Sequence, residues 1–229
     1  MNTTDRRRLL GPANAKLPEF MDTGATFSTP TKNDDEIRHM FLKTGLVGNA
    51  NGSAYLEIGD TIIEVSVFGP RPIRGSFIHR ASFSVECKFL PYISQPNEAM
   101  YTDKPTGFNN NGKPGLTSME HRISSYLETA LLPSILLEKY PKSTIDIFAT
   151  VISTPSTSSV KSNLSSLHLC TWLTNCAALA LVDAGIECRD IVTSGQVRLN
   201  TAANRLIMDP IQGSKDEEEP GVDAVISFM

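Results

Sequence analysis

The sequence predicts an α+β domain, in which helices cover a β-sheet that has one buried face. Three observations predict this fold class: period-2 alternation of apolar residues near the start of the chain, one amphipathic helical segment, and one helical segment that is apolar on nearly every side. With 229 residues, of which 40% are hydrophobic, the chain can bury a core of normal size. We therefore expect one large domain with its helices packed against strands.

The first 36 residues precede any regular pattern. They are polar, they contain Pro12, Pro18 and Pro30, and neither a period of 2 nor one of 3.6 residues persists in them. We predict a partly disordered N-terminal arm over residues 1–36, followed by a domain over residues 37–229.

Residues 40–89 are expected to form four strands of a mainly antiparallel meander. The dipeptides Asn51-Gly52 and Gly59-Asp60 predict hairpin turns. Gly69-Pro70 is expected to end the third strand, because proline cannot donate a hydrogen bond to a ladder. In the fourth strand, over residues 80–89, apolar and polar residues alternate without a break, so one face is expected to be buried.

A polar insertion separates the meander from the first helix. Residues 92–115 are expected to form a flexible surface loop. The helix that follows presents one apolar face between Met119 and Leu131, and Pro133 should interrupt it.

The second half of the chain combines strands with a buried helix. A strand is expected over residues 145–151. The helix over about residues 165–184 is apolar nearly all round, so it should be buried, and Gly185 is expected to cap its C-terminus. Two strands should follow, near residues 191–199 and 222–228, separated by a linker that carries an acidic run.

The net charge of −4 argues against strong binding of RNA by the chain alone, because such affinity depends on neutralising phosphates. The run from Asp216 to Glu219 supplies four of the negative charges, so the remainder of the chain is neutral. This run is expected to be a solvated loop. Contact with RNA would therefore depend on local basic clusters.

Two basic clusters are candidates for binding. Arg71, Arg74 and Arg80 lie in the loop between two strands, and guanidinium groups bind phosphate through paired hydrogen bonds. They are candidate RNA contacts; a solvated turn or a protein interface is the alternative. The run from Arg6 to Arg8 could serve nuclear import, RNA contact or docking, and the adjacent Leu9 and Leu10 favour docking on a partner subunit.

The cysteines and histidines show no spacing typical of a metal site. Cys87, Cys170, Cys176 and Cys188 form no CxxC pair, and each lies in an apolar pattern, so we predict free buried thiols in a reducing compartment. No phosphate-binding loop or nucleophile motif is found. We predict no cofactor and no metal.

Four segments of the chain are informative when taken together. They are GLVGNANGSAYLEIGDTIIEVSVFGPRPIRGSF (45–77), FSVECKFLP (83–91), KYPKSTIDIFATVI (139–152) and ALALVDAGIECRD (178–190). These segments resemble the RNase PH family and occur in that family's order. The resemblance implies an RNase PH-like domain, with a mixed β-sheet meander packed against two or more helices. Two shorter segments, residues 5–12 and 208–210, resemble one exosome ring subunit of the family.

The resemblance also implies that the catalytic positions are lost. Active members carry a Gly-Gly-(Ser/Thr)-Arg segment at the start of the buried helix, where it holds the attacking phosphate. The matching residues here are 167–170, with Cys170 at the arginine position. Arg198 and Asn204 fall at positions of paired acidic residues, and Leu116-Thr117 falls where active members carry two arginines. The chain is therefore expected not to be an enzyme.

By resemblance, the chain is expected to be a structural subunit of the RNA exosome ring, which supports 3'–5' RNA processing, including rRNA processing, and RNA degradation. Its expected partners are other RNase PH-like subunits in a six-membered ring, an OB-fold or KH-type cap protein, a processive ribonuclease, and RNA threaded through the channel. The expected location is the nucleus, nucleolus and cytoplasm, with no membrane association.

Two other functions stay open. The chain could be an active phosphate-dependent 3'–5' exoribonuclease whose site is completed by another subunit, or an adaptor outside any exosome. Family members usually continue with a further strand and helix, so the C-terminal part is expected to be short or missing, and an apolar sheet face should be exposed.

Overall fold

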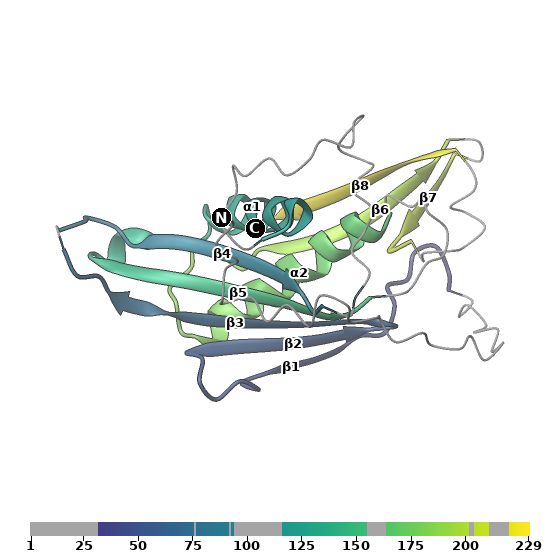
Figure 1. Ribbon diagram of the computed structural model, residues 1–229. Coiled ribbons are helices and arrows are strands. Elements are labelled where there is room, and N and C mark those ends of the chain that lie inside the picture. The colour runs from purple at the N-terminus through teal and green to yellow at the C-terminus, as the bar shows by residue number, and fades with distance from the viewer. Residues whose placement is uncertain are drawn as a thin grey trace, which may run out of the picture.

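The computed structural model describes residues 32–75, 77–91, 93, 116–154, 164–201, 204–210 and 220–229. It contains two sheets with a helix between them (Figure 1). The elements in chain order are β1 (Phe41–Thr44), β2 (Gly52–Ile58), β3 (Thr61–Pro72), β4 (Ser82–Phe89), α1 (Ser118–Leu131), the 3₁₀ turn η2 (Leu137–Lys139), β5 (Ser143–Ser153), α2 (Leu164–Asp183), β6 (Thr193–Asn200), β7 (Arg205–Met208) and β8 (Gly221–Phe228).

The helix α2 is the centre of the fold. It packs against β2 and β3 of the five-stranded sheet on one side and against β6 and β8 of the three-stranded sheet on the other. The helix α1 covers β4 and touches α2. A single core cluster joins the inward residues of the large sheet to both helices. The predicted α+β class is confirmed, and α2 is buried as its apolar sequence indicates.

The boundaries of both helices follow from their sequence. Thr117 caps α1: its hydroxyl accepts from the Glu120 backbone, and the Glu120 carboxylate accepts from the Thr117 backbone. The helix ends at Leu131, two residues before Pro133, as predicted. Gly185 follows α2 with a φ of +68°, a left-handed conformation in which glycine has no Cβ penalty.

The predicted antiparallel meander is wrong in its strand order. The large sheet has the order β1-β2-β3-β5-β4, so β5 lies between β3 and β4. β4 pairs with β5 in parallel, with Val85 opposite Ile147. Alternation along a strand shows which side is buried but not which strand lies beside it. The inward residues of β5 are buried, and its position between β3 and β4 provides hydrogen-bond partners along both of its edges.

One local prediction in this sheet is wrong: the strand β3 does not end at Gly69-Pro70 but continues to Pro72, because a register shift between Phe68 and Arg71 takes Pro70 out of the ladder. The predicted hairpin of β1 and β2 is confirmed, but its turn is longer than two residues, and Gly52 begins β2. A Cβ at Gly52 would lie 2.2 Å from the backbone nitrogen of Ala184, so glycine is required there by packing against the end of α2.

The three-stranded sheet has its polar side turned inward. On β6, Gln196, Arg198 and Asn200 are buried, while Leu199 is exposed. The outer face is apolar, in agreement with the expected exposed sheet face. The short strand β7, which pairs with β6, was not predicted, and only one of its residues is buried. The large apolar residues exposed on this face are Leu199, Leu206, Val222, Ile226 and Phe228.

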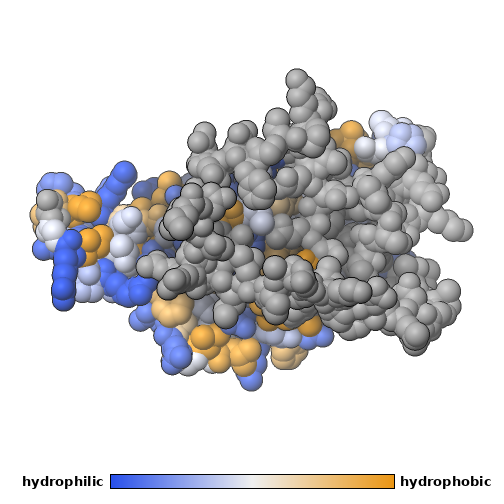
Figure 2. All heavy atoms as spheres, viewed as in Figure 1, coloured by the Kyte–Doolittle hydropathy of each residue, from blue (hydrophilic) through white to orange (hydrophobic). Residues whose placement is uncertain are grey.

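Apolar side chains also gather at the lower edge of the molecule in Figure 2, where Figure 1 places β1 and β2. β1 is an edge strand, and Phe41 on it is 56% exposed while its ring contacts Tyr55. An exposed apolar edge strand can pair with another chain.

Several predicted features lie outside the described residues. These are the run from Arg6 to Arg8, nearly all of the insertion 92–115 and the acidic run 216–219. The described end of the predicted arm contacts the domain: the Lys32 ammonium donates to the carbonyl oxygens of Met208 and Asp209. Among the described helices, none combines the length and apolar character needed to span a lipid bilayer.

A degenerate cleft between the helices

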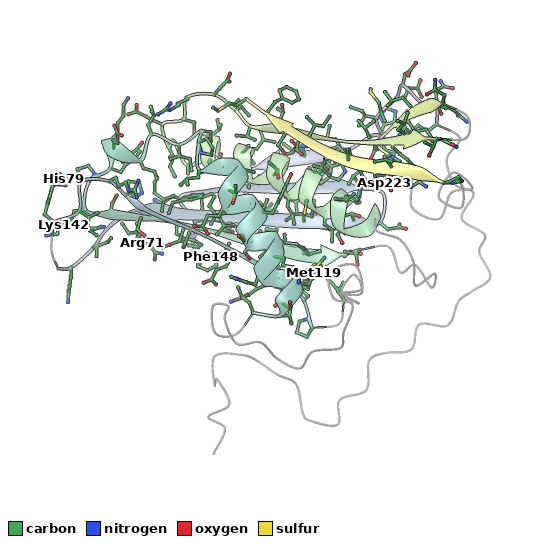
Figure 3. All side chains as sticks on the ribbon, turned by 90° about the horizontal axis from the view of Figure 1, so that it is seen from above. Arg71, His79, Met119, Lys142, Phe148 and Asp223 are labelled. Carbon is green, nitrogen blue, oxygen red and sulfur yellow. The ribbon has the colours of Figure 1, made fainter. Side chains whose placement is uncertain are left out.

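The positions matched to a phosphate site lie at the start of α2, beside a pocket of about 250 Å³. The pocket is bounded by α1, α2 and β8, and Figure 3 labels Met119 on its α1 side. Leu167 and Cys170 both line it. The complete lining is Met119, Arg122, Ile123, Tyr126, Ser166, Leu167, Cys170 and Val225.

The thiol of Cys170 offers no charge to an anion. Burial raises its pKa to about 12, so the thiol is protonated at neutral pH. Leu167 adds an apolar side chain where a glycine would let an amide approach a phosphate. Arg122 is the one cation among the lining residues, and sequence reasoning missed it because it lies on α1.

His168 points away from this pocket into a buried polar cluster. Its Nδ1 accepts hydrogen bonds from Arg38 Nη2 and Trp172 Nε1, both at 3.2 Å. Because these two groups can only donate, the ring proton resides on Nε2, which lies 3.3 Å from the Thr61 hydroxyl. Burial, and to a smaller extent the charge of Arg38, lowers the pKa of His168 to about 3, so the ring is neutral.

The same cluster joins the start of the domain to the residues after β7. Arg38 Nε and Nη2 donate to the two carboxylate oxygens of Asp209 at 2.8 and 2.7 Å. Burial by itself raises the pKa of Asp209, but the hydrogen bonds and charge of Arg38 outweigh it, and the net shift is downward. Arg38 is therefore engaged in structure, and nothing in its local sequence indicated this.

Arg198 and Asn204, at the matched acidic positions, have different surroundings. Arg198 is buried and forms an ion pair with Asp223 on β8 at 2.8 Å; Figure 3 labels Asp223. Asp223 lies two residues before Val225 on the same side of β8, so the pair is next to the pocket. Asn204 is exposed in the turn before β7, with a φ of +47°. In the part of the chain that the structure describes, neither matched position therefore places an acidic group here.

Within the described ranges, no group of three or more His, Cys, Asp or Glu residues could hold a metal ion. All four cysteines are free thiols. At the matched pair before α1, Leu116 is half-buried and Thr117 is the helix cap.

A model of the family described as "3' exoribonuclease family, domain 1" (RNase PH) matches residues 36–187, which is more than half of the chain. The chain belongs to this family. The resemblance stated from its motifs is confirmed.

Relatives from this family cover nearly the whole chain. The exosome complex component mtr3 of Schizosaccharomyces pombe is 31% identical over 209 residues, which span 90% of this chain and 72% of the relative. The exosome complex component RRP41-like of Arabidopsis thaliana is 34% identical over 216 residues, 94% of this chain and 71% of the relative. Both support the expected likeness to exosome components.

A solved structure confirms the RNase PH fold. The crystal structure of rice (Oryza sativa) Rrp46 superposes with a TM-score of 0.60 and 20% identity, and the match covers 86% of this chain and 83% of that chain. At this identity, the likeness concerns the fold.

The three candidate RNA-binding arginines of this RNase PH domain do not form one cluster. Arg71 lies on the open face of the large sheet, where it pairs with Asp146 at 2.7 Å and stays 55% exposed. Arg74 is exposed in the loop after β3. Arg80 lines a separate hollow of about 620 Å³ between α1 and η2, together with Arg189. The predicted RNA contact is therefore best centred on Arg71 and Arg74, and it stays a prediction.

Proposed function

We propose that the chain is a non-catalytic subunit of the RNA exosome ring, which supports 3'–5' RNA processing and degradation without cleaving RNA itself. The matches to exosome components support the ring role. The observation that carries the non-catalytic part is that the matched positions in this pocket, Leu167 and Cys170, are uncharged, while Arg198 is paired with Asp223.

Phosphorolysis requires that inorganic phosphate be held in place as it attacks. A cradle of amides and a guanidinium would supply this, and loss of one such donor costs on the order of 10²–10³ in rate. In this chain the four matched residues include Leu167 at a glycine position and, at the arginine position, Cys170, whose thiol pKa is raised to about 12. The matched acidic position holds Arg198, which cannot act as a general acid or bind a cation.

The proposed partners are other RNase PH-like subunits in a six-membered ring, a cap protein, a processive ribonuclease and the RNA that passes through the ring. The proposed locations are the nucleus, nucleolus and cytoplasm. The apolar edge at β1 and the apolar face of the small sheet are consistent with a subunit that buries much surface against other chains. Affinity purification of the tagged full chain, followed by identification of the bound subunits, tests these partners.

The alternative is an active phosphate-dependent exoribonuclease, and one observation favours it. Arg122 lines the pocket and could contact an anion if a neighbouring subunit supplied the missing groups. The family description, 3' exoribonuclease, names the chemistry that would then occur.

Incubation with RNA and phosphate distinguishes the two functions. The chain, alone and assembled with an RNase PH-like partner that is itself inactive, is expected to release no nucleoside diphosphates, while an active family member serves as the positive control. Release of nucleoside diphosphates that disappears in an Arg122→Gln variant would establish the alternative.

A further inference from the structure

Two aromatic side chains lie together on the open face of the large sheet. Phe68 of β3 and Phe148 of β5 have ring centroids 5.6 Å apart, with ring planes at 74°. β3 and β5 are adjacent strands in the interior of the sheet. The residues next to them in sequence, Val67 and Ile147, are fully buried against the helices, so both phenyl rings project from the opposite face.

Arg71 extends this aromatic pair with a planar cation. Its guanidinium carbon lies 5.6 Å from the centroid of the Phe68 ring, and its Nη2 donates to Asp146 Oδ2 at 2.7 Å. The other carboxylate oxygen of Asp146 accepts from the Ser84 hydroxyl at 2.7 Å. These contacts fix the orientation of the guanidinium, yet 55% of the side chain stays exposed.

Among the described residues, cations gather at one end of this pair. Figure 3 shows His79, Lys142, Arg71 and Phe148 following one another from the tip of the sheet toward its middle. Lys142 is exposed, and its backbone bonds to Ile78, which places it beside the loop that carries Arg74. Phosphate groups would therefore be favoured at the tip.

Carboxylates lie on the same face beyond Phe148. The register places Glu86 of β4 beside Phe148, and Lys88 pairs with Glu86 at 3.5 Å. Glu64 of β3 lies further along the same face. Two carboxylates outnumber the one ammonium there, so phosphates are favoured less than at the tip, and contact beyond Phe148 would come mainly from uncharged bases.

We propose that Phe68, Phe148 and Arg71 form a platform on which bases of single-stranded RNA stack, with the backbone phosphates directed toward Arg74 and Lys142. Nucleobases stack on phenyl rings and on guanidinium planes, and such stacking tolerates any sequence because every base has a π-face. Two aromatic residues on adjacent central strands of an open sheet are one arrangement that presents bases in this way. The platform rests on the proposed function, since it assigns the RNA contact to this sheet face.

The test uses the full chain assembled with RNase PH-like ring subunits and two fluorescent single-stranded probes, an oligoadenylate and the same backbone with abasic positions. Phe148→Leu keeps an apolar side chain but removes the π-face. We expect roughly tenfold weaker binding of oligoadenylate and unchanged binding of the abasic probe. Phe148→Tyr, which restores a π-face, should bind as the unchanged chain does.

Phe41→Leu is the matched control. Phe41 is also a phenylalanine in edge contact with another ring, although it is 56% exposed whereas Phe148 is half-buried. It lies on β1, and among the described residues no guanidinium lies over its ring or that of Tyr55. Its replacement should leave both affinities unchanged. Arg71→Lys keeps the charge but loses the planar group, so oligoadenylate binding should fall while the salt dependence of binding stays the same.

Three outcomes overturn the platform. One is equal binding of oligoadenylate by the unchanged assembly and by Phe148→Leu. Another is an equal loss for Phe148→Leu and Phe41→Leu. The third is that Phe148→Tyr enters the assembly but Phe148→Leu does not. That result would show that this face is a protein interface. Each of these three outcomes leaves the proposed ring role in place. If the assembly without substitutions binds neither probe, the proposed passage of RNA through the ring is contradicted as well.

Discussion

Arg198 and Asp223 form an ion pair that joins the neighbouring strands β6 and β8 next to the pocket between α1, α2 and β8. Arg198 Nη1 donates to both carboxylate oxygens of Asp223, at 3.0 and 2.8 Å. The two residues are directly opposite in the register of β6 and β8, and their side chains are 6% and 14% exposed. The positive charge at this matched acidic position is therefore balanced within the chain.

Breaking this pair should destabilise the protein. Arg198→Met leaves the Asp223 carboxylate without its cation, and removal of one partner of a buried ion pair costs about 3 kcal/mol or more. We expect the free energy of unfolding, measured by urea denaturation, to fall by about that amount. The double variant Arg198→Met with Asp223→Leu should recover most of the loss, because no uncompensated charge remains. If the loss in the free energy of unfolding of the double variant equals the sum of the two single losses, the interaction between Arg198 and Asp223 does not stabilise the protein.

Gly52 should not tolerate a side chain. Gly52→Ala places a Cβ against the backbone at Ala184, where the closest atom is 2.2 Å away. We expect a loss of about 2 kcal/mol or more in the free energy of unfolding, in the range of overpacked sites. Gly48→Ala is the matched control, since nothing lies within 4 Å of its Cβ position. Equal stability of the two variants would mean that β2 and α2 do not approach as described.

His168 should make stability depend on pH. Its pKa in the folded protein is about 3, below the ordinary value of 6.5. Burial is the larger cause, and the nearby charge of Arg38 is the smaller one. Between these values the unfolded chain binds the proton and the folded chain does not, so stability is complete above about 6.5 and declines as the pH falls toward 3. The urea midpoint should therefore decrease from pH 7 to pH 4. The decrease should be smaller in His168→Gln. In the control His39→Gln, which replaces an exposed histidine, the decrease should be the same as in the unsubstituted protein. Equal pH profiles for all three proteins would contradict the role given to His168.

The cysteines should differ in their rate of alkylation. Burial raises the pKa values of Cys170 and Cys176 to about 12; Cys176 is buried, and Cys170 is half-buried at the pocket. Cys188 is less buried, although burial raises its pKa as well. Because the thiolate is the reactive form, iodoacetamide should modify Cys188 first in the folded protein, as followed by mass spectrometry of peptides. Unfolding in urea should remove the difference, and rapid modification of folded Cys170 would show that the cleft is open.

The sequence predicted most elements to within a few residues. The first helix was expected from Met119 and spans Ser118–Leu131, and the second was expected over about 165–184 and spans Leu164–Asp183. Helical periodicity, the stop at Pro133 and the glycine after α2 are local signals, and they were sufficient. β7 was missed because four residues with one buried position give no recognisable alternation.

The cleft was harder to predict than the elements. The resemblance named Cys170 and Arg198, but Arg122 and Asp223, which complete their surroundings, come from other elements. The aromatic pair on the open face of the large sheet was also not predicted from the sequence. Phe68 and Phe148 are adjacent only because β5 inserts beside β3.

The sequence by itself determined where strands and helices form, which side of each is buried, and which residue types stand at the matched catalytic positions, because these properties depend on residues within one or two turns of chain. Only the tertiary structure decided the strand order and the partners of the charged residues. Arg38 contacts His168 across 130 positions and Asp209 across 171. Such contacts follow from packing of whole elements around α2, which no local pattern encodes.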